Sequence, residues 1–549
     1  MVLVDLQGAA QEAADREVPT LDAAQVAERL AGRDATLWGP DAEPEASKRL
    51  GWLDPAEHSR PLLGQIEELR AELAAEGVDR VVLCGMGGSS LAPEVICATA
   101  GVPLVVLDGT DPGQVARATA GDLSRTVVVV SSKSGSTVET DSQRRALAAA
   151  FEAEGIDSLS RIVVVTDPGS PLDVSARAAG HRRVFNADPD VGGRYSALTA
   201  FGLVPSGLAG ADVAALLDQA AALRPSLAQP GARNPGLVLG AALGAAQSEG
   251  GTRLDKLLIV DEGSGLVGFG DWAEQLVAES TGKDGTGLLP VVAERTDAQA
   301  QSPSSDVLVA HLLAGTPGSQ APVDGHARIA VQGPLGAQFL LWEFAVAVAG
   351  RLLGINPFDQ PDVESAKKAA RGQLEDAGDP APPDLVDDGI EMRATAGLLE
   401  GVSGLEAAVV ALLDQVGPDG YLAVMAYLDR EADAALAGVR GTLARRTGRP
   451  TTFGWGPRFL HSTGQYHKGG PAQGVFLQVT SAPAGADVEV PDQPFTFGQL
   501  IAAQASGDAQ VLADHGRPVL RVHLTDRAQL RRLVEVLGSP VAGGSEAVE

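Results

Sequence analysis

The sequence has few cysteines, few lysines and a large deficit of positive charge. Its two cysteines, Cys84 and Cys97, cannot build a disulfide framework and lie in no C-x-x-C motif. The eight histidines are scattered, so no metal site and no other cofactor is predicted. A formal net charge of −29 argues against a nucleic-acid-binding surface and against adhesion to anionic membranes. We therefore expect a cytoplasmic protein that binds neither nucleic acid nor membrane.

Targeting and membrane-spanning segments are not evident either. The N-terminus, MVLVD, carries an acid in place of the basic and apolar regions of a signal peptide. The apolar run 339–353 is interrupted by Glu343 and Arg351, and we expect it to be too short to span a bilayer.

Short apolar runs alternate with segments that permit helix. A first set of predicted strands comprises 80–84, 103–107, 126–130 and 161–165, and a second comprises 256–260, 287–292 and 327–331. Buried strands that alternate with helices predict parallel sheets covered on both faces. The predicted fold is α/β, with two doubly wound parallel-sheet domains and a C-terminal α/β extension. Predicted boundaries are 1–60 for a helical segment, 61–225 and 226–375 for the two domains, and 390–549 for the extension.

Two segments rich in glycine and hydroxyl groups follow strands of the first set. They are GMGGSS (85–90) and SSKSGSTVET (131–140). Both leave carboxyl ends of strands, where ligands bind in parallel sheets. Small residues let backbone N–H groups approach an anion, and hydroxyls add donors. The first loop alone fits an ordinary tight turn equally well. Neither matches a Walker A or G-x-G-x-x-G motif, which favours the phosphate of a small molecule over a nucleotide.

Six segments together resemble the phosphoglucose isomerase family. The two loops are similar to the phosphate loops of its sugar isomerase domains, and four further segments are similar to those that carry the family's active-site residues: VGGRYS (191–196), EQLVAESTGK (274–283), NPFDQPDVESAK (356–367) and LHSTGQY (460–466). The resemblance implies two sugar isomerase domains, a sugar-phosphate substrate, no cofactor and a homodimer. It places substrate contacts at Gly88, Ser89, Ser132, Lys133, Ser134, Thr137, Thr140, Gln275 and Gln360.

The chemistry of aldose–ketose isomerisation assigns roles to the remaining matched residues. One carboxylate beside two neighbouring carbons can move a proton between them, and the resemblance gives this role to Glu279. Arg194, which follows two glycines, would stabilise the anionic enediolate. His461 would open the sugar ring, because an imidazole with an ordinary pKa near ~6.5 can donate or accept a proton. Lys367 would be its partner.

The place of the histidine departs from the family's order. His461 follows the closing motif 356–367 by about a hundred residues, as in a variant related to transaldolase–isomerase fusions. His311 lies nearer the usual place. Its surroundings, VAHLL (309–313), predict the apolar face of a helix, where a histidine is more often a core residue. We favour His461, and we expect the region 390–549 to complete the active site.

The sequence thus predicts reversible isomerisation of glucose 6-phosphate to fructose 6-phosphate. A dual phosphoglucose/phosphomannose isomerase would share the same base and stays open as an alternative. A non-catalytic sugar-phosphate-binding regulator is disfavoured, because candidates for the base, the cation and the histidine are all present.

Overall fold

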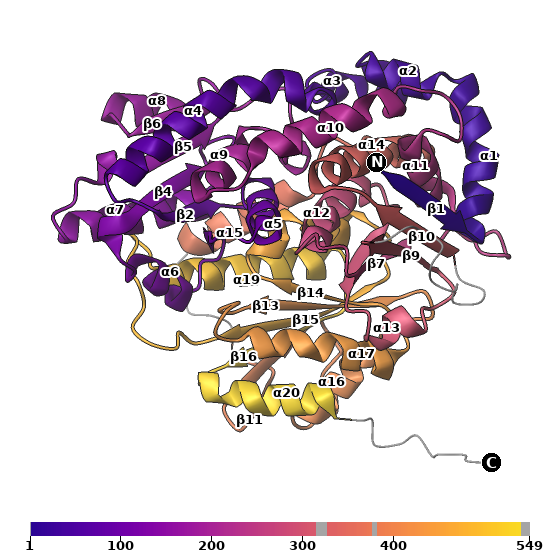
Figure 1. Ribbon diagram of the computed structural model, residues 1–549. Helices are drawn as coiled ribbons and strands as arrows, with labels where there is room; N and C mark the ends of the chain where they lie inside the picture. Colours follow the sequence, from indigo (N-terminus) through magenta and orange to yellow (C-terminus); the bar gives the residue numbers. More distant parts are fainter. Residues whose placement is uncertain (1, 315–326, 376–381, 540–549) are drawn as a thin grey trace.

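The computed structural model of the protein contains three sheets (Figure 1). It describes residues 2–314, 327–375 and 382–539, and for 363–367 and 375 it describes the backbone alone.

The first sheet is wholly parallel, with strand order β3-β2-β4-β5-β6. Its strands are β2 (Arg80–Gly85), β3 (Val105–Leu107), β4 (Thr126–Ser131), β5 (Ile162–Thr166) and β6 (Arg183–Asn186). The helices around it are α4 (Pro55–Ala75), α5 (Leu91–Ala100), α6 (Pro112–Thr119), α7 (Val138–Ala153), α8 (Pro171–Ala179) and α9 (Ala200–Ala209). In β4, Val127 and Val129 face the core shared with α4, α5 and α9, whereas Val128 and Val130 face α6 and α7. The four central residues of this strand are all valine, which fits a strand whose two faces are both covered.

The second sheet has the order β1-β10-β9-β7-β8, and only β1 runs antiparallel. Its strands are β1 (Leu3–Gln7), β7 (Lys256–Glu262), β8 (Leu289–Ala293), β9 (Val307–Leu313) and β10 (Ala327–Gln332). The helices of this half are α1 (Ala9–Ala23), α2 (Val26–Ala31), α3 (Glu43–Ala46), α10 (Val213–Leu227), α11 (Pro235–Ala245), α12 (Phe269–Thr281), α13 (Ala298–Gln301) and α14 (Leu335–Leu353).

Two expectations about this half are wrong. The segment around His311 is not a helix but strand β9. The buried valine and leucine residues on both sides of the histidine are as compatible with a strand as with a helix. The N-terminus is not purely helical, because Leu3–Gln7 forms an edge strand against β10.

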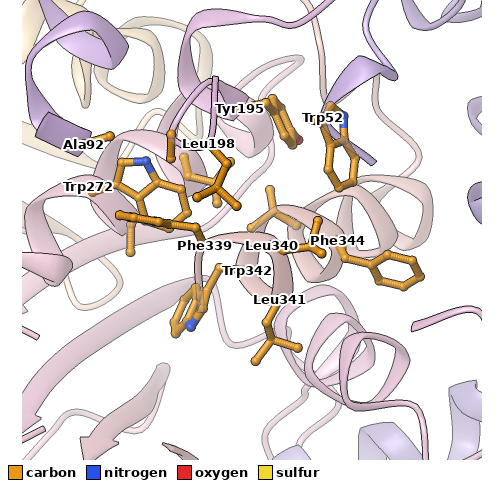
Figure 2. Close-up of a cluster of buried hydrophobic side chains, with 14 of the residues drawn as sticks. Trp52, Ala92, Tyr195, Leu198, Trp272, Phe339, Leu340, Leu341, Trp342 and Phe344 are labelled. Atoms are coloured by element: carbon orange, nitrogen blue, oxygen red, sulfur yellow. The ribbon is translucent and has the colours of Figure 1, made fainter. Parts of the chain in front are cut away.

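Helix α14 runs through the centre of the largest hydrophobic core. It is apolar on all sides because other helices surround it. Figure 2 shows Phe339, Leu340 and Trp342 of this helix among aromatic side chains that include Trp272 and Tyr195. At 19 residues α14 has the length and hydropathy to cross a membrane, contrary to our expectation, but 89% of its most apolar stretch is buried inside the protein. Burial, and not a lack of length, is what indicates a core helix.

The C-terminal region forms a six-stranded sheet, ordered β11-β12-β16-β15-β13-β14. Its strands are β11 (Leu385–Asp387), β12 (Ile390–Ala394), β13 (Tyr421–Tyr427), β14 (Thr451–Trp455), β15 (Gly474–Ser481) and β16 (Val519–Leu524). The helices are α15 (Val363–Glu375), α16 (Leu405–Leu413), α17 (Val439–Thr447), α18 (Gly464–Gly469), α19 (Phe497–Asp514) and α20 (Leu530–Gly538). In Figure 1, α15 and α19 lie between this sheet and the upper half of the molecule.

Strand β13 joins two cores. Leu422 and Val424 pack on the core of α16, α17 and α20. Tyr421 and Met425, on the opposite face, share a core with Leu258 and the alternate residues of β7 and β8. The C-terminal region therefore covers one face of the second sheet. The predicted α/β class, with two doubly wound sheets and a C-terminal α/β extension, is confirmed, and the exact domain boundaries stay a prediction.

Candidate active site

The carboxyl ends of β2 and β4 lie side by side in the first sheet. The chain runs from β2 to β3 on one side and later enters β4 on the other, so the strand order reverses between β2 and β4. Ligands of open α/β sheets bind in the crevice at such a reversal. The loops 85–90 and 131–140 follow these two strands, and both therefore lie at this position.

Hydroxyl groups of the loop after β4 form hydrogen bonds with one another. Ser132 Oγ lies 3.2 Å from Thr137 Oγ1 and accepts a hydrogen bond from the N–H of Gly135. Ser134 and Ser136 are exposed, and their hydroxyl oxygens are 2.8 Å apart. Thr137 is the N-cap of α7 but makes no capping hydrogen bond with its side chain. The first N–H groups of α7 are thus open to an anion.

The lysine of this loop is already paired. Lys133 Nζ lies 2.6 Å from Asp167 Oδ2 and donates to the carbonyl oxygen of Pro189 at 3.2 Å. Its charge is consequently balanced by a carboxylate that follows β5.

The glycines of the first loop allow close backbone approach. A Cβ on Gly88 would lie 2.0 Å from the carbonyl oxygen of Gly193, next to Arg194. Gly87 has a φ of +55°, and a Cβ there would lie 2.9 Å from the carbonyl oxygen of His461. Side chains at these positions would push apart the segments that carry the arginine and the histidine.

Arg194 and Glu279 form a buried ion pair. Arg194 Nη1 lies 3.4 Å from Glu279 Oε2, and the two residues are only 3% and 5% exposed. Burial raises the pKa of Glu279 above its ordinary value, while the charges of Arg194 and His461 oppose that rise. A carboxylate with a raised pKa is a stronger base, which suits abstraction of a carbon-bound proton.

Four further hydrogen bonds fix the orientation of the Arg194 guanidinium. Nε donates to Ser280 Oγ at 2.9 Å, and the hydroxyl of Tyr195 lies 3.2 Å from the same oxygen. Nη2 donates to the carbonyl oxygens of Pro357 and Asp359, each at 2.8 Å, and Nη1 donates to Gln360 Oε1 at 3.2 Å. The arginine thus ties the closing motif 356–367 to the carboxylate.

A second buried cation supports this motif. Lys283 Nζ donates to the carbonyl oxygens of Asn356 and Asp359 and to Asp359 Oδ1, at 2.7–2.8 Å. Burial, followed by the charge of Arg194, lowers the pKa of Lys283 to about 8, against the opposing charge of Asp359.

His461 faces the phosphate loop. Its Nε2 lies 3.2 Å from Glu139 Oε1, and the same carboxylate oxygen accepts a hydrogen bond from Gln504 Nε2 at 2.7 Å. Gln275 Nε2 donates to the carbonyl oxygen of His461 at 2.7 Å and lies 3.5 Å from Glu279 Oε2. A continuous series of contacts therefore connects the loop after β4, through the histidine, to the buried ion pair.

A charge cluster anchors the turn that carries the histidine. Arg458, three residues before His461, donates to Asp108 Oδ2 at 2.6 Å and lies 2.6 Å from Glu94 Oε2. Arg430 binds the other oxygen of Glu94 at 2.8 Å. Glu94 lies in α5 and Asp108 follows β3, so the C-terminal region is ion-paired to the sheet that bears the phosphate loops.

Most of the predicted site residues converge on this crevice. Arg194, Gln275, Glu279, Gln360 and His461 are linked by the contacts above, and Gly88, Ser132, Ser134 and Thr137 line the adjoining loops. Thr140 is buried in the first turn of α7, and its hydroxyl has no hydrogen-bond partner in the part of the chain that the structure describes. Ser89 is half-buried in the first loop. Lys367 belongs to α15, but its side chain lies outside the described residues.

His311 lies outside this network. Its Nδ1 is 3.1 Å from Glu262 Oε1 at the end of β7, and burial lowers the pKa of its imidazole.

Glu139, Gln504, Ser280 and Lys283 contribute contacts that the assignment of roles from sequence missed. Glu139 stands inside the matched loop, so its position was a usable signal. Gln504 lies in a helix far along the chain, and nothing local marks it. Across residues 2–314, 327–375 and 382–539 no group of three or more His, Cys, Asp or Glu side chains is placed to hold a metal ion.

Comparison with known proteins gives a consistent result. The family model described as phosphoglucose isomerase matches residues 66–287. A probable glucose-6-phosphate isomerase of Natronomonas pharaonis is 33% identical over 350 residues, which are 55% of this chain and 81% of that relative. The chain belongs to the phosphoglucose isomerase family. A glucose-6-phosphate isomerase of Synechococcus is 30% identical over 424 residues, covering 65% of this chain and 78% of the relative.

Solved structures of related fold agree with this membership. A hypothetical protein of Thermus thermophilus aligns over 68% of this chain and all of its own, with 26% identity and a TM-score of 0.56. A glucose-6-phosphate isomerase of Chlamydia trachomatis, at 20% identity and a TM-score of 0.50, covers 64% of this chain and 78% of its own and shows the shared fold. The phosphoglucose isomerase match includes both phosphate loops, Arg194, Gln275 and Glu279, and it ends before Gln360 and His461.

Proposed function

We propose that this chain is an aldose–ketose isomerase that interconverts glucose 6-phosphate and fructose 6-phosphate. The observation that carries the proposal is the contact series from the hydroxyl loop, through Glu139 and His461, to Glu279 and Arg194. In support of the proposal, the hydroxyl loop, the imidazole of His461 and the buried carboxylate–guanidinium pair lie in one crevice. These are the groups that an isomerisation through an enediolate requires.

Ring opening comes first. The phosphate binds to the hydroxyls and helix N-terminus of the loop after β4. His461 gives a proton to the ring oxygen while the unprotonated amine of Lys367 takes the hydroxyl proton from C1, which breaks the C1–O5 bond and leaves an aldehyde. Glu139 accepts at His461 Nε2 and so fixes the orientation of the ring. We propose Lys367 as the partner of His461 in this step.

Proton transfer follows on the open chain. The carboxylate of Glu279 takes the proton from C2, the C–H electrons form the enediolate double bond, and negative charge develops on O1. Arg194, already oriented by its carbonyl and hydroxyl partners, stabilises that charge. A proton moves from O2 to O1, and Glu279 returns its proton to C1 to give the ketose. Gln275 and Gln360 hold the sugar hydroxyls as neutral partners.

A coupled assay of purified protein with glucose 6-phosphate tests this function. We expect fructose 6-phosphate to form without added metal, and deuterium from solvent to enter the sugar at C1 or C2. A protein that binds the sugar phosphate but never turns it over would instead be a regulator. Measuring mannose 6-phosphate in parallel decides whether a second epimer is also a substrate.

We propose that His461 acts within its own chain. Two contacts within the chain support this: the imidazole lies beside Glu139, and Gln275 donates to the backbone carbonyl oxygen of His461. A homodimer, implied by the family resemblance, would then not be needed to supply the histidine.

The cytoplasm remains our proposed compartment, supported by two cysteines that are both free and buried.

A further inference from the structure

The cavity between the phosphate loop and α15 has an unusual charge balance. Its volume is about 230 Å³, and one wall is formed by Ser134, Ser136 and Thr137 of the loop after β4. His461 and Glu139 line its inner end. The net charge of −29 on the chain works against a bound anion. A phosphate dianion in this place needs a cation that other carboxylates have not already neutralised.

The lysines near the cavity whose side chains the structure describes do not meet this need. Lys133 is paired with Asp167 at 2.6 Å. Lys468, which also lines the cavity, is buried and lies 2.6 Å from Asp508 Oδ1. Arg194 is committed to Glu279 and to the carbonyl oxygens of the closing motif.

Among the side chains that the structure describes on the cavity wall, Arg371 is the remaining cation. It lies in α15, opposite the loop hydroxyls, and its side chain is exposed. It forms no hydrogen bond or ion pair with any residue that the structure describes. Its helix packs closely on α19: a Cβ on Gly507 would lie 2.8 Å from the backbone nitrogen of Ala370. A guanidinium at this site can donate two parallel hydrogen bonds to phosphate oxygens.

We propose that Arg371 is a phosphate-binding residue that completes the anion cradle from the side of α15. The loop supplies neutral hydroxyl and N–H donors, and Arg371 supplies the positive charge. Because it contacts only the phosphate, it selects for phosphorylated sugars and takes no part in proton transfer. This inference rests on the proposed isomerase function, since it assigns a further residue to the same substrate.

The test compares Arg371→Gln with Lys368→Gln, which removes an exposed charge from the same helix at a residue that does not line the cavity. For Arg371→Gln we expect the KM for glucose 6-phosphate to rise about tenfold, the range for one lost charge-assisted hydrogen bond. The kcat should stay within about twofold, and Arg371→Lys should recover part of the loss. Lys368→Gln should leave both constants unchanged.

A second measurement does not depend on turnover. Titration calorimetry with inorganic phosphate should give about tenfold weaker binding for Arg371→Gln than for the wild type and for Lys368→Gln. Equal phosphate affinity in all three proteins would overturn the proposal, as would a fall in kcat at unchanged KM. If the wild type binds phosphate through Arg371 but isomerises no sugar phosphate, the proposed function fails and the Arg371 assignment stands. Thermal unfolding of each variant shows whether a loss of binding comes from unfolding.

Discussion

The first and second sheets have related topologies but contribute different chemistry. The first is covered on both faces mainly by its own helices, and it ends in loops of glycine and hydroxyl residues that are largely neutral and partly exposed. The second is covered on one face by the C-terminal region, and Glu279 on its helix α12 is buried beside Arg194. We propose that the crevice has a phosphate side, formed by these loops, and a reaction side, formed around Glu279 and Arg194. Changes on the reaction side should lower kcat, and changes on the phosphate side should raise KM.

The largest effect is expected for Glu279→Gln. The amide keeps the shape of the side chain but cannot accept the proton from C2, so kcat should fall by roughly 10³–10⁴-fold. Binding of inorganic phosphate should persist, because the phosphate side is untouched. Steady-state kinetics measures the fall in kcat, and calorimetry measures the binding of inorganic phosphate. Turnover close to that of the wild type would remove Glu279 from the mechanism.

Arg194→Gln should lower kcat by roughly 10²–10³-fold through loss of enediolate stabilisation. It should also move the pH profile. Burial raises the pKa of Glu279 and the charge of Arg194 opposes this, so removing the arginine raises that pKa further. Because the base must be ionised, activity is lost as pH falls through its pKa, and the acid limb of kcat should shift to higher pH. If the acid limb of the kcat profile stays at the same pH, a group other than Glu279 controls it.

His461→Ala should cost about 10²-fold in kcat, because the ring must then open without a positioned acid. The same variant tests whether the site is confined to one chain. Co-assembled Glu279→Gln and His461→Ala chains should stay as inactive as either alone. Recovery of activity in the mixture would mean that the histidine crosses between subunits.

Arg458→Lys tests the connection between the two sides. A lysine cannot satisfy both Asp108 and Glu94, so the turn before His461 should loosen and kcat should fall about tenfold with little change in KM. Arg430→Lys is the matched control, because it weakens the same cluster without lying in the histidine turn. Equal effects of both variants on kcat would indicate that the cluster only stabilises the fold.

The smallest effects belong to the phosphate loop. Ser134→Ala and Thr137→Ala each remove one neutral hydrogen bond, which at about 0.5–1.5 kcal/mol corresponds to a rise in KM of roughly two- to tenfold. The kcat should not change. A larger loss in kcat than in KM would contradict the division of the crevice into a binding side and a reaction side.

Local patterns carried most of the fold prediction. Apolar runs such as 127–130 and 257–260 became the middle of central parallel strands, because burial on both faces demands that composition. The wrong prediction of a helix at His311 also comes from reliance on a local pattern. A short apolar run is compatible with a helix or a strand, and here pairing with β7 and β10 makes it a strand. The short edge strand at residues 3–7 was missed, since its conformation comes from pairing with β10, more than three hundred residues away in the chain.

The sequence by itself determined the kinds of group available: hydroxyl and glycine loops after strands, one candidate each for base and stabilising cation, and two for the histidine. The loops follow from residue identity and from the rule that parallel strands end at one edge, and the other candidates follow from the resemblance to the family. Only the tertiary structure decided which of these groups meet. Packing of the C-terminal region on the open face of the second sheet brings His461 to Glu139 and Gln275. It also places Arg371 across the cavity from the loop, because contacts between distant segments depend on the packing of whole sheets and leave no local trace in the chain.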